Sequence, residues 1–456
     1  MLTSPDNHFP SPGMNVQMVR AGSSVTIESR KAQGGQGVLY RGKTQQGAPV
    51  AVKWYRPSRA LDRQRRAIRE LAMHSRPHPA FAWPIDIVEC PGIQSFGYVM
   101  QWVPDRFGSL IEMLRAPDPP SFRVIIDIAL ELVDAFAALH SEGLCYRDVN
   151  FGNLLVDPDR REVAIVDNDN IGTEGGDVFV KGTLRFMAPE VIRDEAEPST
   201  ITDLHSLAVF LFFLLMRGHP LEGHRVFQSY TWNSDSHISE TQLAIHNFGI
   251  DPLFVFDPQT TANAPEPGSP VLVWWPIYPK FVRDLFIRAF CSGLSDASLN
   301  GRITEGEWRR AFMRLRDVLS ECRCGASVFW DAENPTEKCW HCATLPPQPT
   351  LLKLPGRSVV LVPGATLTSD QIVRDGDRHV IVGVVERHPK NPNGLVLRNV
   401  SSEDWTAAPI GEDLKVVKPT QRLGIRQMTL TISRTTGEIT VPPSTAPAGD
   451  PTAPTT

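Results

Sequence analysis

The sequence predicts an α+β chain of several domains, in which a large mixed domain is followed by a small cysteine-rich ribbon and an all-β domain of sandwich type. Three observations predict this organisation. Strand-like segments precede long apolar helical segments in residues 21–320, four cysteines gather within residues 321–345, and residues 358–442 alternate between apolar and polar side chains. A chain of 456 residues also exceeds the usual size of one hydrophobic core.

The composition argues against several classes of function. Charged residues make up 21% of the chain and the formal net charge is -5, so there is no basic surface for nucleic acid or for anionic membranes. The longest apolar run, Leu207 to Met216, is too short to cross a bilayer, and the N-terminus lacks the pattern of a signal peptide. Cys90, Cys145 and Cys291 are scattered, which is typical of a reduced compartment. We therefore expect a cytoplasmic protein that binds neither nucleic acid nor membrane.

The first domain contains both kinds of secondary structure. Residues 1–20 are rich in Pro, Ser and Asn without periodicity, so we expect a flexible tail there. Apolar periodicity then predicts a strand over residues 48–55 and helices over residues 62–74, 121–143, 202–218, 280–290 and 304–319. The irregular segment 225–279 is long for a connection, and we expect its aromatic side chains to pack on the core of the domain. These elements define a domain over residues 21–320.

The C-terminal part consists of short strand-like segments. Within residues 358–442, "SVVLV", "HVIVGVVE", "GLVLRNVS", "LKVVKP" and "MTLTIS" are separated by turn residues, which predicts a small β-sandwich. The Pro-rich residues 346–357 indicate a linker, and residues 443–456 have the composition of a disordered tail. The segment "GLVLRNVSSEDW" (394–405) is similar to part of the forkhead-associated sandwich, so we assign the domain to protein interaction.

A glycine-rich segment and a strand lysine are the first signs of a phosphate-binding site. The segment "KAQGGQGVLYRG" supplies Gly34, Gly35 and Gly37, which let backbone N–H groups approach phosphate oxygens. Sixteen residues later Lys53 lies on an apolar strand, and Glu70 on the following helix is a suitable partner for its ammonium. Each feature alone has a common alternative, a glycine-rich hairpin or an unrelated surface pair. Together they predict a cation positioned for phosphates.

Two further segments supply the remaining groups that phosphoryl transfer requires. "YRDVNFGN" places Asp148 five residues before Asn153, directly after a long helix, and "VAIVDND" ends an apolar strand with Asp167. A proton acceptor for a substrate hydroxyl, together with an amide and a carboxylate oxygen for Mg²⁺, is the set of groups this chemistry uses. Their order and spacing make coincidence a poor explanation.

These motifs resemble those of the eukaryotic-like protein kinases of bacteria over about residues 23–320. The chain also carries "GTLRFMAPE" (182–190), whose Glu190 corresponds to a residue that pairs with a late arginine, here Arg302 in "GRITEGEW". Asp203, in "TDLHSLAVFLFFLLMRGHPL", matches the aspartate that ties down the catalytic loop. The resemblance implies the bilobal protein-kinase fold and transfer of the γ-phosphoryl group of ATP to a protein hydroxyl.

The resemblance also implies roles for individual residues. Asp148 is implied as the catalytic base, and Lys53 as the phosphate-binding cation that Glu70 anchors. Asn153 and Asp167 are implied as Mg²⁺ ligands, and "VMQWV" resembles the hinge that meets adenine. The implied contacts of Mg·ATP are therefore Gly34, Gly35, Gly37, Lys53, Glu70, Met100, Gln101, Val103, Asn153 and Asp167.

The chain departs from the family pattern at several positions. Asn150 stands where Ser/Thr kinases have a lysine whose charge offsets the phosphate during transfer. The usual Asp-Phe-Gly is Asp167-Asn168-Asp169, which keeps the metal ligand. Thr183 matches the threonine that Ser/Thr kinases place beside the base, so we expect Ser/Thr specificity.

Four cysteines predict a metal site after the kinase-like domain. In "CRCGASVFWDAENPTEKCWHC" a Cys-x-Cys pair is followed, after fourteen residues, by a Cys-x-x-Cys pair. Two close pairs on two turns bring four thiolates to tetrahedral distance around Zn²⁺, and a loop this short could hardly fold without the ion. The alternative, four free cysteines, is disfavoured in a reduced compartment. We expect Cys322, Cys324, Cys339 and Cys342 to bind a structural zinc ion.

Three segments resemble one group of bacterial kinases that carry a zinc ribbon after the kinase domain. They are "GIDPLFVFDP" (249–258), "VWWPIYPKFVRDLF" (273–286) and "RITEGEW". Kinases of this group occur in tellurite-resistance-type gene clusters, beside a metal-dependent protein phosphatase and a von Willebrand factor A protein. The resemblance implies these two proteins as partners, the latter as a substrate.

Two other functions compete with that of an active Ser/Thr kinase. Asn150 and Asn168 favour a pseudokinase scaffold that binds nucleotide and assembles the phosphatase and von Willebrand A partners. A small-molecule kinase of the aminoglycoside type shares the Asp…Asn…Asp geometry, but "MAPE", Asp203 and Arg302 are features of protein kinases. The complete set of core catalytic residues favours an active kinase that uses ATP, Mg²⁺ and Zn²⁺.

Overall fold

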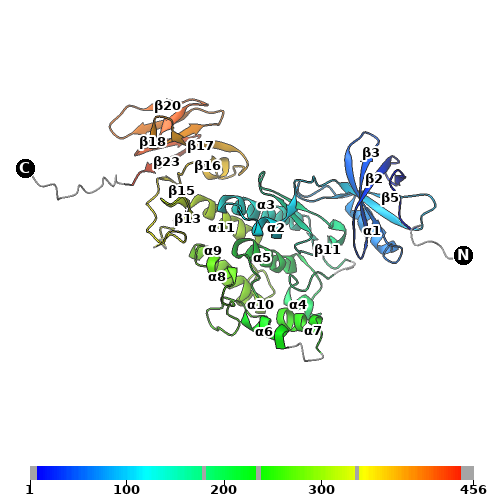
Figure 1. Cartoon of the computed structure of the whole chain (residues 1–456). Helices are drawn as coiled ribbons and strands as arrows, with labels where there is room; N and C mark the ends of the chain where they lie inside the picture. Colours follow the sequence, from blue (N-terminus) through cyan, green and yellow to red (C-terminus); the bar gives the residue numbers. More distant parts are fainter. Residues whose placement is uncertain (1–7, 177–180, 233–237, 334–337, 443–456) are drawn as a thin grey trace, which may run out of the picture. The chain divides into compact units, whose positions relative to one another are not determined.

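The computed structural model describes residues 8–176, 181–232, 238–333 and 338–442, coloured along the chain in Figure 1. The chain divides into two compact units, Met1–Phe312 and Met313–Thr456. The first unit has the mixture of strands and helices that the sequence predicts, and the second holds the cysteine cluster and β-rich sheets. The predicted fold class is confirmed. The predicted domain boundaries stay predictions, except that the structure places strands inside the expected tail 1–20 and the expected linker 346–357.

The smaller lobe of the first unit is a closed antiparallel barrel with the strand order β1-β2-β3-β4-β6-β5 (Figure 1). Its strands are β1 Asn15–Met18, β2 Ser24–Gln33, β3 Gly37–Thr44, β4 Pro49–Tyr55, β5 Pro84–Glu89 and β6 Phe96–Gln101. Successive residues of a strand face opposite sides, and Val25, Val52 and Trp54 fill the interior of the barrel. The predicted strand over residues 48–55 is confirmed as β4.

The predicted flexible tail of residues 1–20 is wrong where it includes β1. This strand pairs with both β2 and β5, so it closes the barrel. The side chain of Val16 is completely buried there, while its neighbour Gln17 is exposed. A strand this short shows little periodicity of its own, and its pairing partners supply the stability instead. Residues 1–7 lie outside the described residues.

Helix α1 Asp62–Leu71 packs against this barrel (Figure 1). Gln64, Ile68 and Leu71 form its buried face, because a spacing of four and then three residues places side chains on one side of a helix. Ile68 belongs to the core that β4, β5 and β6 share. The helix predicted over residues 62–74 is confirmed, although it ends at Leu71.

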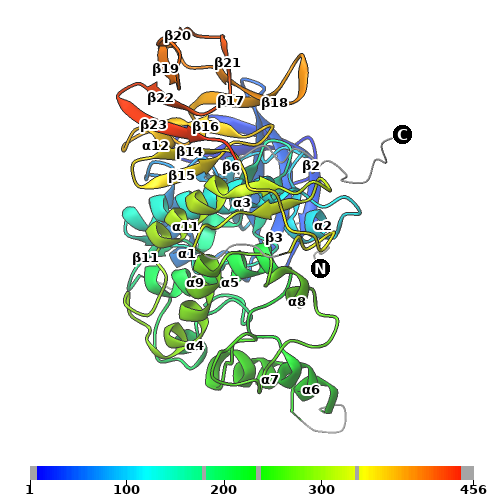
Figure 2. The same cartoon turned by 90° about the vertical axis from the view of Figure 1, so that its left-hand side faces the viewer.

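The larger lobe of the first unit is mainly helical. Its helices are α2 Leu110–Arg115, α3 Phe122–Ser141, α4 Pro189–Ile192, α5 Thr200–Met216, α6 His224–Trp232, α7 Glu240–Ile245, α8 Pro270–Trp274, α9 Lys280–Phe290 and α10 Ser292–Ser295, with a π-helical turn at His246–Ile250. Helix α11 Glu305–Asp317 begins in this unit and crosses the boundary to the second. Helix α5 lies in the middle of the lobe, close to α3, α8 and α9 (Figure 1, Figure 2), because nearly all of its side chains are apolar and buried.

Local sequence signals set the ends of the two longest helices. The Ser121 side chain accepts a hydrogen bond from the Val124 backbone at 3.4 Å at the start of α3, and Gly143 follows its end with a φ of 70°. Ser199 and Thr202 form a capping box at the start of α5. The helices predicted for this lobe are confirmed, with ends that differ by at most two residues. Among the described residues, no helix is both long and apolar enough to span a membrane.

The irregular segment before α9 packs on the helical lobe, as its composition predicts. Tyr278 contacts Phe122 of α3, with ring centroids 5.6 Å apart, and Phe254 lies 5.7 Å from Phe212 of α5. Both Tyr278 and Phe254 are almost completely buried. Residues 233–237 of this segment lie outside the described residues.

Short strands of the larger lobe position its loops. They are β7 Gly108–Ser109, β8 Leu144–Cys145, β9 Leu154–Asp157, β10 Glu162–Ile165 and β11 Gly172–Thr173. Strands β9 and β10 form a hairpin in which Leu154 pairs with Ile165. Asn153, just before β9, and Val166, just after β10, are therefore neighbours, and the Val166 backbone donates to the Asn153 carbonyl at 2.9 Å. Strand β8 also forms an antiparallel pair, with β11.

The second unit contains a hairpin and two antiparallel sheets. Strands β12 Leu319–Glu321 and β13 Ser327–Phe329 form the hairpin. In their order across the larger sheet, the strands are β15 Arg357–Val360, β14 Leu351–Leu354, β23 Thr435–Thr440, β22 Met428–Ile432, β19 Trp405–Pro409 and β20 Lys415–Val417. In their order across the smaller sheet, the strands are β16 Thr366–Thr368, β17 Ile381–His388, β18 Asn391–Asn399 and β21 Arg422–Gly424. The short helix α12 Ser369–Ile372 follows β16 in sequence.

Both sheets of the second unit contribute to one hydrophobic core, as in a β-sandwich. Leu352, Trp405 and Ile439 of the larger sheet are completely buried in it. Val385 and Leu397 of the smaller sheet belong to the same cluster. The β-rich C-terminal region that the sequence predicts is confirmed.

The predicted linker over residues 346–357 is wrong from residue 351 onward. Leu351–Leu354 is strand β14, which pairs with β15 and with β23 inside the larger sheet. Its side chains Leu351 and Leu352 are buried, and this apolar burial outweighs the prolines that precede the strand. The predicted tail over residues 443–456 lies outside the described residues.

Candidate active site and cysteine cluster

The loop after α3 and β8 is held in place by a buried carboxylate. Asp203 of α5 accepts hydrogen bonds from the backbone N–H groups of Tyr146 and Arg147, the latter at 2.9 Å. Asp203 is only 1% exposed, and backbone donors satisfy a carboxylate in such a position. The expectation that Asp203 ties down this loop is confirmed.

His140, at the end of α3, reinforces the same anchor. Its Nε2 lies 3.3 Å from Asp203, and its Nδ1 contacts the carboxylate of Glu305. Burial of the ring opposes protonation, but the hydrogen bonds to these two carboxylates outweigh burial and raise the pKa of His140 to about 9. His140 is therefore a cation at neutral pH.

Asp148 lies in a loop that two asparagines shape. The side-chain amides of Asn150 and Asn153 both donate to the Asp148 carbonyl, at 3.2 and 3.0 Å. Asn150 also accepts from the Gly152 backbone at 2.8 Å, so its side chain has a local structural role. The Thr183 hydroxyl donates to Asp148 Oδ1 at 2.9 Å, which orients the carboxylate that the sequence identifies as the candidate base.

Lys53 of β4 lies at the centre of an ionic network. Its ammonium contacts the carboxylate of Asp167 directly, and it lies 2.9 and 3.0 Å from the two oxygens of Asp169. The side-chain carbonyl of Gln36 accepts a further hydrogen bond from the same ammonium at 2.7 Å. The lysine and the strand-end aspartate that the sequence singles out are thus brought together, although 114 residues separate them.

Two carboxylates share the single ammonium of Lys53. Burial and the charge of Asp169 raise the pKa of Asp167 above its ordinary value. Although burial opposes it, Lys53 and the Tyr55 hydroxyl hold the pKa of Asp169 below its ordinary value. Burial also opposes the charge of Lys53, yet the two aspartates raise its pKa. The network therefore keeps an ammonium opposite at least one carboxylate.

The structure does not bring Glu70 to Lys53, contrary to the expected pair. Glu70 is exposed on α1, because it lies two residues, or about 200°, around the helix from the buried Ile68. Gln64 occupies the inward face instead, and its amide donates to the Asp169 backbone carbonyl at 3.1 Å. Gln64 shares the helical spacing of Ile68 and Leu71, which was the available signal in the sequence.

The glycine-rich loop lies between β2 and β3 and reaches Lys53 through Gln36. A Cβ on Gly34 or Gly35 would meet no heavy atom within 4 Å, so these two positions are open. A Cβ on Gly37 would lie 2.0 Å from the Trp54 carbonyl, so glycine is required there by the close approach of β4. Of the three glycines, Gly34 and Gly35 have open space beside the backbone, although the Gly34 N–H already donates to the Gly37 carbonyl at 2.9 Å.

Two of the expected hinge residues, Met100 and Gln101, end β6, and the third, Val103, follows two residues later. Met100 is buried and pairs with Ala51 of β4. Gln101 is exposed, and Val103 is partly buried against the core that also contains Met100. The expectation that this stretch contacts adenine stays a prediction.

A buried ion pair links two distant parts of the larger lobe. One guanidinium nitrogen of Arg302 lies 2.7 Å from both carboxylate oxygens of Glu190, and both residues are buried. The pairing that the sequence predicts for these two residues is confirmed. Such a pair costs stability when one partner is removed, because the other charge is left buried.

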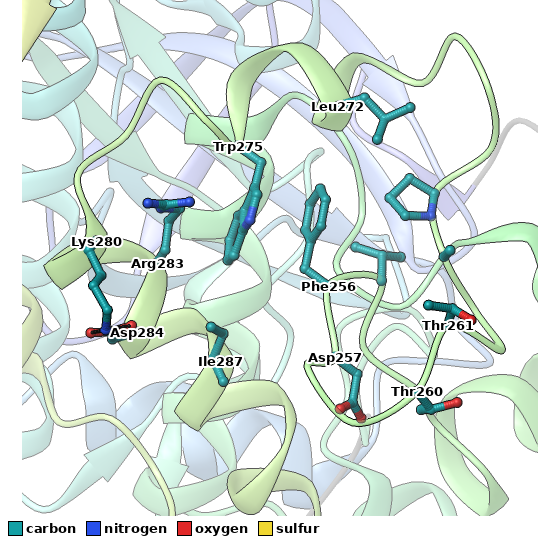
Figure 3. Close-up of a pocket in the computed structure, with 13 residues that line it drawn as sticks. Phe256, Asp257, Thr260, Thr261, Leu272, Trp275, Lys280, Arg283, Asp284 and Ile287 are labelled. Carbon is teal, nitrogen blue, oxygen red and sulfur yellow. Dashed lines mark hydrogen bonds and ion pairs between the residues drawn. The ribbon is translucent and has the colours of Figure 1, made fainter. Parts of the chain in front are cut away.

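A cavity of about 530 Å³ lies elsewhere in the larger lobe, between α9 and the segment before α8 (Figure 3). Phe256 and Trp275 stack there with ring centroids 4.3 Å apart, and Ile287 of α9 lines the same space. None of the residues of the Lys53 network lines this cavity. It is therefore separate from the candidate active site.

The four cysteines after α11 converge on one point. Their Sγ atoms all lie within 4.8 Å of one another, with Cys322 and Cys342 at 3.7 Å and Cys324 and Cys339 at 3.8 Å. A tetrahedron of Zn–S bonds of about 2.3 Å has edges of about 3.8 Å, whereas a disulfide bond is about 2.05 Å long. The cluster is consistent with zinc, as the spacing of the cysteines predicts. The ring of His341 is not part of the group.

Comparison with known proteins identifies the first unit. Residues 29–261 match the family model of the protein kinase domain. The chain is 25% identical to the receptor-interacting serine/threonine-protein kinase 1 of Homo sapiens, over 46% of this chain and 34% of that protein. It is 27% identical to the serine/threonine/tyrosine-protein kinase HT1 of Arabidopsis thaliana, over 44% of this chain and 53% of that protein. It is 30% identical to the dual specificity testis-specific protein kinase 1 of Mus musculus, over 24% of this chain and 19% of that protein.

The chain spans less than two thirds of the length of each of these relatives. The family match nevertheless covers just over half of the chain. It includes Lys53, Asp148 and Asp167, which come from separate elements and lie in one unit. On this evidence the chain belongs to the protein kinase family.

Proposed function

We propose that this chain is an ATP- and Mg²⁺-dependent protein kinase that phosphorylates Ser/Thr hydroxyls of a protein partner and of itself. The observation that carries the proposal is the contact between Lys53 and Asp167, with Asn153 beside Asp167 at the end of the β9–β10 hairpin. Asn153 in turn donates to the carbonyl of Asp148 at 3.0 Å. Cation, metal ligands and base therefore belong to one continuous arrangement.

The residues present fit a nucleotide with its metal. Mg²⁺, when bound, neutralises negative charge on the phosphates. The ammonium of Lys53 would bind phosphate oxygens, and the carboxylate of Asp167 and the amide oxygen of Asn153 would hold the metal. The amide nitrogen of Asn153 donates to a backbone carbonyl, which leaves its oxygen for this task.

The substrate hydroxyl would lose its proton to Asp148. The hydrogen bond from Thr183 to Oδ1 fixes the orientation of this carboxylate and leaves Oδ2 to accept the proton. A threonine at this place supports Ser/Thr specificity. One of the three relatives is named a serine/threonine-protein kinase, whereas the names of the other two include tyrosine or dual specificity. The buried Glu190–Arg302 pair supports a protein substrate rather than a small molecule, because that pair is a feature of protein kinases.

The other parts of the proposal concern zinc, location and partners. The four cysteines would hold a structural Zn²⁺, since all four positions of a tetrahedron are filled by protein ligands. A bacterial source, with a von Willebrand A protein as substrate and a metal-dependent phosphatase as partner, is supported by the resemblance of residues 249–258 and 273–286. A cytoplasmic location is supported by the scattered cysteines Cys90, Cys145 and Cys291. Labelled ATP with the purified von Willebrand A protein would test the substrate.

A pseudokinase scaffold is the second candidate, and the Lys53 network favours it. The ammonium already has Gln36, Asp167 and Asp169 as partners, so a nucleotide has to displace at least Gln36. Asn150 supplies no charge where Ser/Thr kinases have a lysine, and its side chain is engaged within the loop. Such a protein would bind nucleotide and transfer phosphate slowly or not at all.

Autophosphorylation separates the two candidates. With γ-labelled ATP and Mg²⁺, we expect label in the wild-type chain and a loss of about a thousandfold or more in Asp148→Ala, because the base is removed. Far-ultraviolet circular dichroism and thermal melting should show that the variant is folded. Binding of Mg·ATP without labelling of the wild type would establish the scaffold. Equal labelling of both proteins, or no binding at millimolar Mg·ATP, would contradict the kinase proposal.

A further inference from the structure

We infer that Asp169 is the positioning residue that holds Lys53 for phosphate binding, in the place where the family resemblance puts the helix residue Glu70. This inference rests on the proposed function and identifies the residue that keeps the phosphate-binding ammonium in place. Asp169 is the third residue of Asp167-Asn168-Asp169, a position at which the family has glycine. It is therefore a feature of this chain and not of the family pattern.

The contacts of Asp169 identify it as an anchor. Its side chain is completely buried, and its two oxygens lie 3.0 and 2.9 Å from Lys53 Nζ. The Tyr55 hydroxyl donates to the same carboxylate. A buried carboxylate is stable only with such partners, so the three side chains depend on one another.

Asp167 cannot serve as the permanent anchor of Lys53. Its side chain is 31% exposed, whereas that of Asp169 is 0% exposed. When Asp167 holds a metal, its charge is engaged there and its attraction for Lys53 weakens. Both oxygens of Asp169 are taken by Lys53 and Tyr55 inside the protein, so Asp169 keeps the ammonium in place while the metal is bound.

Helix α1 contributes an amide to this arrangement instead of a carboxylate. Glu70 is exposed, and Gln64 holds the inward position. The Gln64 amide donates to the Asp169 backbone carbonyl at 3.1 Å and lies 3.5 Å from the Tyr55 hydroxyl. A neutral amide beside a buried aspartate avoids the repulsion that a second buried carboxylate would add. Gln64 and Asp169 therefore fit each other as a pair.

The turn that carries Asp169 is itself firmly held. Asn168–Asn170 is a single 3-10 turn, and Asp167 in front of it has a left-handed φ of 61°. The Asn168 side chain donates to the Ile165 carbonyl at 3.1 Å. The anchor of the lysine and the candidate metal ligand thus lie two residues apart on one turn, which α1 supports through the Gln64 amide.

Steady-state kinetics on the full chain tests the inference. We expect Asp169→Asn, which keeps the shape and removes the charge, to raise KM for ATP and lower kcat/KM by about tenfold to a hundredfold, since a charged hydrogen bond is lost. Asp159→Asn, an exposed change of the same type in the β9–β10 turn, is the matched control and should leave both constants unchanged. A purely structural role would lower the melting temperature and the active fraction but not raise KM.

Relocating the carboxylate gives a second kinetic test. The double variant Asp169→Asn with Gln64→Glu places the charge on the inward face of α1, next to the same network, and should recover part of the lost affinity for Mg·ATP. Glu70→Gln tests the competing anchor. A rise in KM for Glu70→Gln as large as that for Asp169→Asn, or wild-type kinetics in Asp169→Asn, would overturn the inference.

A thermal double-mutant cycle keeps the inference testable if the proposed activity fails. Lys53→Met, Asp169→Asn and the combination are compared with wild type without nucleotide. We expect the double variant to lose less in melting temperature than the sum of the single losses. Lys53→Met removes the ammonium from the buried Asp169 carboxylate, and Asp169→Asn removes one of the two carboxylates from Lys53, so the two changes disrupt the same contact. The same cycle between Lys53 and Glu70 should be additive. Additive losses for Lys53 and Asp169 would show that they are not coupled, whatever the activity of the wild type.

Discussion

At the scale of single residues, His140 shows how a buried charge can stabilise the catalytic loop. Its imidazolium lies between Asp203, which holds the loop backbone, and Glu305 of α11. Protonation therefore ties α3, α5 and the start of α11 together. The ordinary pKa of histidine is 6.5, and the folded value is about 9. The charge is thus retained in the folded protein at pH values where the unfolded chain has lost it.

The stability of the first unit should consequently fall at alkaline pH. Because the folded pKa of His140 lies above the unfolded value, its contribution is fully present below pH 6.5 and is lost as pH rises to about 9. The full loss is about 3 kcal/mol, since a tenfold change in proton affinity is worth about 1.4 kcal/mol. Urea unfolding at pH 6 and pH 9.5 should show a larger difference for wild type than for His140→Gln. An equal pH dependence of the two proteins would contradict this account.

The candidate site residues could be predicted where a motif and its spacing define them. Asp148, Asn153 and Asp167 belong to short motifs next to predicted elements. In the structure Asp167 contacts Lys53, and the Asn153 side chain donates to the Asp148 carbonyl. The assignment of Glu70 relied on its charge and not on its place on the helix. The inward face of α1 is defined by burial against the barrel, and burial is decided by tertiary packing that local sequence does not contain.

At the scale of elements, long periodic segments were predictable and short ones were not. The helices over 121–143 and 202–218 have enough apolar repeats to be recognised, and both are present. Strands β1 and β14 have four residues each and lie beside Pro-rich segments, so composition favoured a tail and a linker. Both owe their existence to pairing with strands distant in sequence, since an isolated short strand is unstable in water.

The structure predicts that β1 is essential to the barrel. Val16→Asp would bury an unpaired carboxylate among apolar side chains and should destabilise the first unit by about 3 kcal/mol or more. Gln17→Lys is the matched control, because it places a charge on an exposed position of the same strand, opposite Glu89 of β5, and it should have little effect. Chemical denaturation of both variants measures the difference. Equal stabilities would mean that the segment behaves as the tail that composition suggests.

At the scale of the whole molecule, the chain keeps its candidate active site and its cysteine cluster in different units. Every residue of the Lys53 network lies within 1–312, and the four cysteines lie within 313–456. Cys322 and Cys339 are buried and take part in a small apolar cluster with Val328. This cluster is too small to hold the hairpin by itself, so we expect a metal to supply most of the stability there.

Removal of the metal should therefore act locally. We expect one zinc ion per purified chain by elemental analysis, and little zinc in Cys324→Ser. The variant should become sensitive to limited proteolysis within residues 319–345, while the proposed nucleotide binding by the first unit is retained. Wild-type zinc content in Cys324→Ser, or loss of Mg·ATP binding together with the zinc, would contradict this separation.

The β9–β10 hairpin gives the two parts of the proposed nucleotide site different entropic costs of assembly. Asn153 and Asp167 are fourteen positions apart in sequence, whereas Lys53 is 114 positions from Asp167. Loop-closure entropy grows with the logarithm of this separation, so the lysine contact is about 2 kcal/mol harder to close. The chain should bring its two candidate metal ligands together through local contacts early in folding and bring the lysine to them last, when the barrel meets the helical lobe.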